Sequence, residues 1–162
     1  MDSEEAARLA RTYGPAVYRM AYARTGNRSD AEDVMQEVFL TLLRRGPEHF
    51  REEGHARAWL LRVTAQRSCD LFRSLARRRE LPLEEAADTP TPVEECGETL
   101  EAVLALPADL RLPVHLFYYE GMTVEEVART LGIGESAVKT RLFRARAKLR
   151  EELTKGGEDL VP

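Results

Sequence analysis

Apolar residues recur at every third or fourth position through most of the chain, the spacing of amphipathic helices. No stretch alternates β-branched and polar residues in the manner of a strand. The pattern predicts an all-α protein, with helices over residues 4–25, 29–45, 56–78, 100–106, 109–120, 123–131 and 135–153. Pro15 is expected to kink or break the first helix, and Pro113 fits a helix only near its first turn.

The helical period stops between the third and fourth predicted helices. Residues 80–98 contain three prolines, seven acidic residues and no lysine or arginine, which is typical of an extended linker. We therefore expect two small helical domains, residues 1–79 and 100–162, joined by an acidic extended linker at 80–99.

The formal net charge of -4 is distributed unevenly along the chain. Residues 1–79 hold 15 basic and 11 acidic side chains, and residues 100–162 hold 9 basic and 10 acidic side chains. Residues 136–150 alone carry six basic side chains and no acidic one. Because local charge rather than total charge sets affinity for phosphates, a nucleic-acid partner is compatible with this acidic chain.

Two helix starts carry capping signals. Ser29 with Glu32, and Thr123 with Glu126, each have the spacing of a capping box, and Met122 can staple onto Val127. The second helix is expected to bury Ala31, Met35, Val38, Phe39 and Leu42. A capped helix at 123–131, a turn through Gly132 and Gly134, and a basic helix from Glu135 together have the layout of a helix-turn-helix, which the C-terminal domain is expected to form.

The last helix presents two different faces. Val138, Leu142, Ala145 and Leu149 form the stripe expected to be buried, and Ser136, Thr140, Phe143 and Ala147 lie opposite, flanked by Lys139 and Arg144. Phe143 can pack on a thymine methyl, while Lys139 or Arg144 can donate to guanine in the major groove. Arg141, Arg146 and Lys148 are better placed for phosphates. The alternative is an ordinary solvated basic helix.

The third helix carries a second polar stripe. Its members recur at intervals of three or four: Trp59, Arg62, Gln66, Asp70, Arg73 and Arg77. An aromatic ring among guanidinium and amide groups suits stacking on bases of a single strand. Periodicity is equally compatible with Trp59 in the core and the other residues solvated.

Other functional classes find little support. Cys69 and Cys96 form no CxxC pair, and the histidines have no ligand spacing with them, so neither a disulfide nor a zinc site is expected. The carboxylates Asp30, Glu32, Asp33 and Glu37 could hold a metal in a helical bundle, but no ExxH pair, phosphate loop or nucleophile setting accompanies them. We expect no enzyme activity and no cofactor. Without a long apolar run or a signal-peptide layout, a cytoplasmic location without membrane insertion is expected.

Three blocks carry a resemblance that spans nearly the whole chain. DAEDVMQEVFLTLL (30–43), AWLLRVTAQRSCDLFRS (58–74) and YYEGMTVEEVARTLGIGESAVKTRLFRARAKL (118–149) resemble, in this order, the blocks of extracytoplasmic-function (ECF) RNA polymerase sigma factors. The third block is shared with many helix-turn-helix regulators, so the first two, with the acidic linker, are the more specific. A stand-alone helix-turn-helix transcriptional regulator is the alternative, although no dimer seam is evident.

The resemblance implies a transcription initiation factor whose partners are core RNA polymerase, promoter DNA and an anti-sigma factor. It assigns polymerase docking on the beta-prime clamp helices to the helix carrying Asp30, Asp33, Gln36, Glu37 and Leu40, with a further contact to the beta flap. It assigns capture of an unpaired base of the minus-ten element to Phe50, Arg51, Trp59, Arg62, Val63, Gln66 and Arg73. Many relatives carry Arg-Asn where this chain has Ala65-Gln66.

The resemblance also assigns the last helix to the minus-thirty-five element. The residues concerned are Ser136, Lys139, Thr140, Arg141, Phe143, Arg144 and Arg146. By the same analogy, the acidic linker follows the polymerase channel that later carries RNA.

Overall fold

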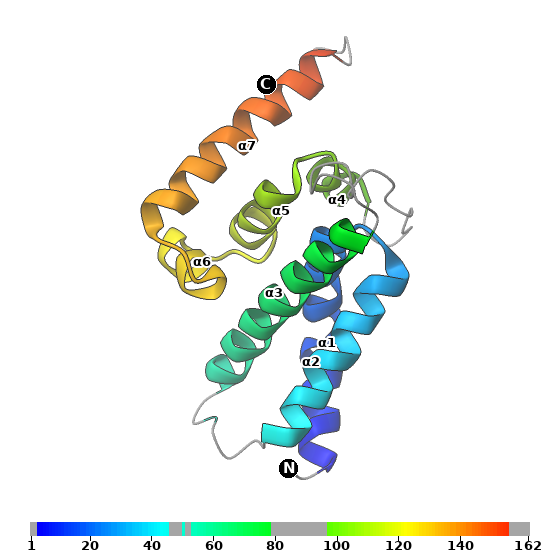
Figure 1. The fold of residues 1–162 in the computed structure, drawn as a ribbon. Helices are drawn as coiled ribbons and strands as arrows, with labels where there is room; N and C mark the ends of the chain where they lie inside the picture. Colours follow the sequence, from blue (N-terminus) through cyan, green and yellow to red (C-terminus); the bar gives the residue numbers. More distant parts are fainter. Residues whose placement is uncertain (1–2, 46–49, 51–52, 79–96, 156–162) are drawn as a thin grey trace.

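The computed structural model describes residues 3–45, 50, 53–78 and 97–155, and every regular element in these ranges is helical. The elements are α1 (Ser3–Thr25), α2 (Arg28–Arg45), α3 (Glu53–Arg78), α4 (Gly97–Leu104), α5 (Ala108–Val114), the π-helical turn η3 (His115–Tyr119), α6 (Val124–Leu131) and α7 (Glu135–Lys155). The predicted all-α class is confirmed. In Figure 1 the helices form an N-terminal group, α1–α3, and a C-terminal group, α4–α7.

The N-terminal group is a bundle of three helices whose buried side chains belong to an apolar core that continues into the C-terminal group. Its most buried side chains, each at most 1% exposed, include Leu9, Val17, Met20, Val34, Val38, Leu42, Leu60 and Leu61. Pro15 does not break α1, which runs from Ser3 to Thr25 with the proline inside it. Both Pro15 and Arg11 are exposed, so the Arg11 carbonyl that loses its helical hydrogen bond at Pro15 can meet water.

Helix α2 begins one residue before the predicted cap. The Asn27 Oδ1 accepts a hydrogen bond from the backbone N–H of Asp30 at 3.1 Å, so Asn27 rather than Ser29 caps the helix. The buried stripe includes Val34, which the sequence pattern did not single out, whereas Met35 and Phe39 are only half-buried. The predicted cap at Ser29 was wrong because Asn27, two residues earlier, is an equally good capping residue.

The capping box of α6 is confirmed. The Thr123 Oγ1 accepts from the Glu126 backbone N–H at 3.1 Å, and Glu126 Oε1 accepts from the Thr123 N–H at 3.0 Å. Met122 and Val127 are both buried in the same core, as the predicted staple requires. Helix α6 ends at Gly132, whose φ of 69° is left-handed and favours glycine.

The helix predicted over residues 109–120 changes from α-helical to π-helical hydrogen bonding at His115. Pro113 lies in the second half of α5, not in its first turn, and the backbone widens into η3 two residues later. There the Glu120 N–H donates to the carbonyl of His115, five residues back, at 3.0 Å. This turn brings the side chain of Glu120 back beside His115.

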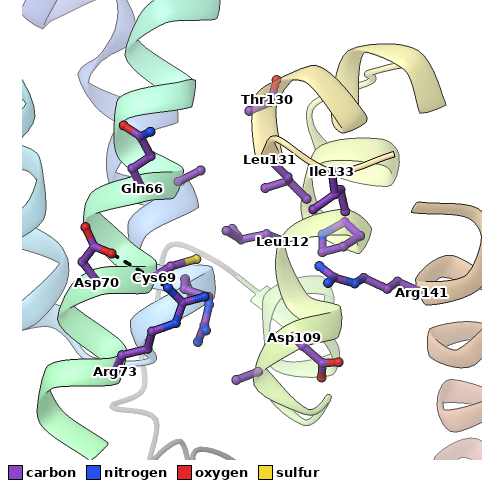
Figure 2. Close-up of a pocket in the computed structure, with 14 residues that line it drawn as sticks. Gln66, Cys69, Asp70, Arg73, Asp109, Leu112, Thr130, Leu131, Ile133 and Arg141 are labelled. Atoms are coloured by element: carbon purple, nitrogen blue, oxygen red, sulfur yellow. Dashed lines mark ion pairs between the residues drawn. The ribbon is translucent and has the colours of Figure 1, made fainter. Parts of the chain in front are cut away.

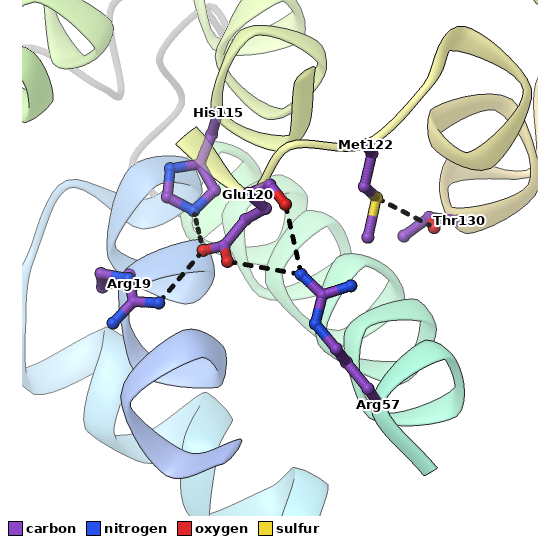
Figure 3. Close-up of polar contacts among 6 residues, drawn as sticks. All are labelled: Arg19, Arg57, His115, Glu120, Met122 and Thr130. Carbon is purple, nitrogen blue, oxygen red and sulfur yellow. Dashed lines mark hydrogen bonds and ion pairs between the residues drawn. The ribbon is translucent and has the colours of Figure 1, made fainter. Parts of the chain in front are cut away.

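Both helical groups pack against each other in a closed arrangement: α1 contacts α4, α5 and η3, and α3 contacts α6. Figure 3 shows Glu120 at this interface, its side chain 6% exposed. Its carboxylate lies 3.1 Å from His115 Nε2, 3.5 Å from Arg19 Nη2 and 3.6 Å from Arg57 Nη2. Arg19 and Arg57 belong to α1 and α3, so Glu120 ties the C-terminal group to two helices of the N-terminal group.

Charge and solvation act in opposite directions on Glu120. Burial raises the pKa of its carboxyl group, but the hydrogen bond with His115 and the charges of His115, Arg19 and Arg57 together outweigh burial and hold the pKa below its ordinary value. The ionised form is therefore the stable form at this interface.

Arg111 makes a second link between the groups. It is 2% exposed and donates to the carbonyls of Leu104 and Leu106 in its own group. It also donates to the carbonyl of Arg24, in the last turn of α1, at 3.3 Å. The carbonyl end of a helix carries partial negative charge, which favours a cation there.

Candidate nucleic-acid interface

The basic face predicted for α7 is exposed in the structure. Val138, Leu142 and Ala145 are buried as predicted, whereas Leu149 is only half-buried. Phe143 is 68% exposed on the other side of α7, and the other outward residues are Ser136, Lys139, Thr140, Arg144 and Ala147. A large exposed aromatic side chain among cations suits contact with bases in a groove.

Two cations predicted to contact phosphates make contacts within the chain. Arg146 Nε donates to the Tyr118 hydroxyl at 2.6 Å, and its guanidinium lies 5.7 Å from the centre of the same ring. Arg141 is half-buried and extends from α7 toward a cavity between the two helical groups (Figure 2). Of the two, Arg146 remains exposed and accessible to a phosphate.

The stripe predicted on α3 is largely exposed, with Arg62, Gln66, Asp70 and Arg73 at the surface. Val63, in contrast, is 9% exposed and belongs to the core, so its side chain is not presented to a nucleotide. Residues 51 and 77 lie outside the residues whose side chains are described.

Trp59 lies partly in the core and is partly accessible, so it fits neither a fully buried residue nor a fully exposed base-stacking residue. It is half-buried and packs against the core, with the Phe50 ring centre 5.7 Å away. The guanidinium of Arg45 lies 5.4 Å from its ring centre. Part of the indole is therefore accessible at an edge framed by an aromatic ring and a cation.

Helix α2 presents the mixed patch that the sequence predicts. Asp33, Gln36 and Glu37 are exposed, and Leu40 is 49% exposed. Leu43, 44% exposed, is on the same helix and was not predicted. Asp30 is half-buried, and its backbone N–H takes part in the Asn27 cap.

A cavity of about 290 Å³ lies between the helical groups and was not foreseen from the sequence. In Figure 2, Gln66, Cys69, Asp70 and Arg73 of α3 face Leu112, Leu131 and Ile133 of the C-terminal group. No local motif joins these residues, because only the packing of one group on the other brings them together.

The described ranges contain no cluster of three or more histidine, cysteine or acidic residues that could hold a metal ion. Among the same residues, no helix is both long and apolar enough to cross a bilayer.

An exposed basic face on a helix-turn-helix and a second polar, aromatic-bearing helix are the features expected of a protein that binds nucleic acid at two surfaces. The family comparison divides the chain in the same way: residues 9–78 match Sigma-70 region 2, and residues 96–149 match Sigma-70, region 4. These are the regions of a bacterial transcription initiation factor. The chain belongs to the ECF RNA polymerase sigma factors.

Several characterised relatives support this membership. ECF RNA polymerase sigma factor SigE of Mycolicibacterium smegmatis is 35% identical over 91% of this chain and 61% of its own length. SigM of Mycobacterium tuberculosis is 31% identical over 87% of this chain and 73% of its own length. SigL of the same organism is 34% identical over 90% of this chain and 86% of its own length.

Solved structures agree on the fold. The sigma factor RpoE of Bartonella quintana, solved in complex with the anti-sigma factor NepR, superposes with a TM-score of 0.72 at 21% identity over 91% of this chain and 95% of that chain. CnrH, solved in complex with the cytosolic domain of CnrY, has a TM-score of 0.64 at 26% identity and covers 95% of this chain and 90% of that chain. Both likenesses cover the N-terminal and C-terminal groups together.

Proposed function

We propose that this chain binds core RNA polymerase and directs it to promoters by reading two DNA elements. The observation that carries the proposal is the outward face of α7, where Phe143 stands 68% exposed among Lys139, Thr140 and Arg144 on a helix-turn-helix. Residues 1–79 would bind polymerase and the minus-ten element, and residues 100–162 the minus-thirty-five element. Residues 80–99 would link them, with the described helix α4 beginning just inside this span at Gly97.

The upstream element would be read in the major groove by α7. Lys139 and Arg144 can donate to guanine and Phe143 can pack on a thymine methyl group, while Ser136, Thr140, Arg141 and Arg146 hold the backbone. Arg141 lines the interdomain cavity and is half-buried, so a duplex backbone would reach it more readily once the two groups separate.

The minus-ten element would be captured as a single strand by α3 and the residues before it. The accessible parts of Trp59 and Phe50 can contact a base, and Arg62, Gln66 and Arg73 are exposed to bind it. Arg51 would assist from the preceding segment. Val63 would support this surface from the core.

Polymerase would dock on α2 through the exposed carboxylates of Asp33 and Glu37 and the exposed Leu40, with Gln36 and Asp30 beside them. Acidic groups around an apolar anchor suit a basic partner surface. This patch is accessible in the closed arrangement, so docking can precede any separation of the two groups.

Reading both elements at once requires the closed arrangement to open. Elements about 25 base pairs apart are separated by on the order of 80 Å of duplex. A compact chain of 162 residues is about 40 Å across. The 18 residues between Arg78 and Gly97 can span about 60 Å when extended, which is enough to separate the groups.

The proposed mechanism is positioning and strand capture, and the chain itself would catalyse no reaction. Its partners, polymerase and promoter DNA, place it in the cytoplasm. The neighbours that share its fold were solved with an anti-sigma factor and with CnrY, which supports an anti-sigma partner for this chain too.

Run-off transcription with core polymerase on a random promoter library tests the proposal. We expect transcripts that start downstream of two shared sequence elements. Reversing the charge of Asp33 and Glu37 to lysine should abolish both these transcripts and co-purification with polymerase. Glu101→Lys, on exposed α4, is the matched control and should change neither. Transcripts without shared elements would contradict the proposal.

A further inference from the structure

The cavity between the helical groups gathers cations from three separate helices. Arg24 of α1, Arg73 of α3 and Arg141 of α7 all line it. Two carboxylates, Asp70 and Asp109, also line it, so the arginines exceed the acids by one. Figure 2 shows Arg73 and Arg141 approaching the cavity from opposite sides.

Arg24 is the member of this set that most needs a counterion. Its side chain lies over the ring of Phe72 at 4.2 Å, and the residue is 7% exposed. Its Nη1 is buried and has no hydrogen-bond partner within the described part of the chain. Buried guanidinium donors are normally paired, because an unpaired buried charge is costly.

The nearby carboxylates do not neutralise Arg24. Asp70 instead lies 4.0 Å from Arg73, and both side chains of that pair are more than half exposed, which makes the pair weak. Asp109 is exposed on α5. The cavity thus keeps a net positive lining, to which exposed Arg73 and half-buried Arg141 present donors. Arg24, whose Nη1 is itself buried, adds a charge that is unpaired among the residues the structure describes.

We infer that this cavity is a binding site for a small molecule that carries a phosphate or carboxylate group, with the oxyanion held by Arg24, Arg73 and Arg141. Guanidinium groups bind such oxyanions through paired hydrogen bonds. The volume of about 290 Å³ is far above the roughly 10–15 Å³ that a cavity needs to hold one water molecule, so a small organic anion fits. Leu112, Leu131 and Ile133 supply an apolar wall for its carbon skeleton.

Such a ligand would favour the closed arrangement, because it contacts α1 and α3 on one side and α5, α6 and α7 on the other. It would also occupy Gln66, Arg73 and Arg141, three side chains assigned to promoter DNA. This regulatory consequence rests on the proposed function, whereas binding of the anion does not.

Calorimetric titration of the full chain with pyrophosphate, inorganic phosphate and citrate, at constant ionic strength, tests the site without polymerase or DNA. We expect saturable binding of one anion per chain, tightest for pyrophosphate, whose charge is concentrated on two phosphoryl groups. Tighter binding of citrate at the same site would assign it to polycarboxylates. Absence of saturable binding by all three anions would overturn the inference, and would leave promoter reading untouched.

Two variants locate the site. Arg24→Met and Arg73→Met should each weaken binding about tenfold or more, since each removes charge-assisted hydrogen bonds. Without anion, Arg24→Met should melt no lower than the unmodified chain, because it removes an unpaired buried charge. Arg129→Met, an exposed control on α6, should retain full affinity. Arg73→Met changes an exposed residue and should fold normally. If it binds the anion with full affinity, the proposed location of the site is wrong, whatever Arg24→Met shows.

Discussion

Phe143 and Arg144 are adjacent, large side chains. Both point away from the core, because the opposite face of their helix is buried. The buried stripe of Val138, Leu142 and Ala145 fixes the rotation of α7 and therefore the direction of both side chains. The packing behind them therefore fixes where both side chains leave the helix, and binding has only their rotamers left to order.

Arg144→Ala should weaken and relax reading of the upstream element. A guanidinium bound to guanine contributes about 1–3 kcal/mol of discrimination, or roughly tenfold to hundredfold in affinity. Competition binding with matched and mutated upstream duplexes measures the loss.

Lys148→Ala is the comparison variant for this experiment. Its exposed ammonium group is assigned to phosphates, so its loss should weaken all duplexes alike and reduce the salt dependence. Unaltered discrimination in Arg144→Ala would contradict the assignment of this side chain to a base.

At the scale of elements, helix α6 owes its start to two reciprocal hydrogen bonds between Thr123 and Glu126. The backbone hydrogen bond with Thr123 is the main cause that lowers the pKa of Glu126, and the hydrogen bond with its side chain acts in the same direction. This capped start sets the angle at which α6 leads into α7.

Thr123→Ala should lower the free energy of unfolding by about 1 kcal/mol, because it leaves the Glu126 N–H without its acceptor. Thermal or urea unfolding followed by circular dichroism measures the change. Thr123→Ser keeps the hydroxyl and should retain most of the stability. Equal losses in both variants would show that the hydroxyl is not what matters.

Elements were predictable where local signals were unambiguous, and less so where two signals competed. The box at Thr123 and the glycine stop at Gly132 each have one interpretation, and both are confirmed. At α2, Asn27 and Ser29 are both good caps, and the structure uses Asn27. The exposed faces of α7 and α2 followed from periodicity, because a helix with one buried stripe must present the opposite residues to solvent.

At the scale of the whole molecule, the closed arrangement depends on contacts that no sequence pattern announces. Glu120, Arg19 and Arg57 are far apart in the chain and meet only at the interface, as do the arginines of the cavity. A pairing between residues 63 or 101 positions apart has no local periodicity to reveal it. The cavity and the interface were therefore outside the reach of sequence analysis.

Glu120→Gln should shift the chain toward open forms, because it removes the charge that Arg19 and Arg57 share. Spin labels at exposed positions 44 and 148, in a background with Cys69→Ala and Cys96→Ser, report the distance between the groups. We expect longer and broader distances for Glu120→Gln. The control Glu125→Gln, which affects only an exposed pair within α6, should leave them unchanged.

Acid should open the unmodified chain through the same group. Because the folded pKa of Glu120 lies below its ordinary value of 4.5, its contribution is complete above pH 4.5 and is lost as the pH falls through the folded value. Label distances in the unmodified chain should therefore lengthen below about pH 4.5, with a smaller change in Glu120→Gln. Identical acid responses in the two proteins would exclude Glu120 as the cause.

The most direct test of the account is run-off transcription by core polymerase and this chain on one promoter selected from the library, with each element scrambled separately. Scrambling either element should reduce correctly started transcripts, and Arg144→Ala should weaken the dependence on the upstream element alone. Transcription that is indifferent to both elements, or absent with every template and core enzyme, would contradict the account.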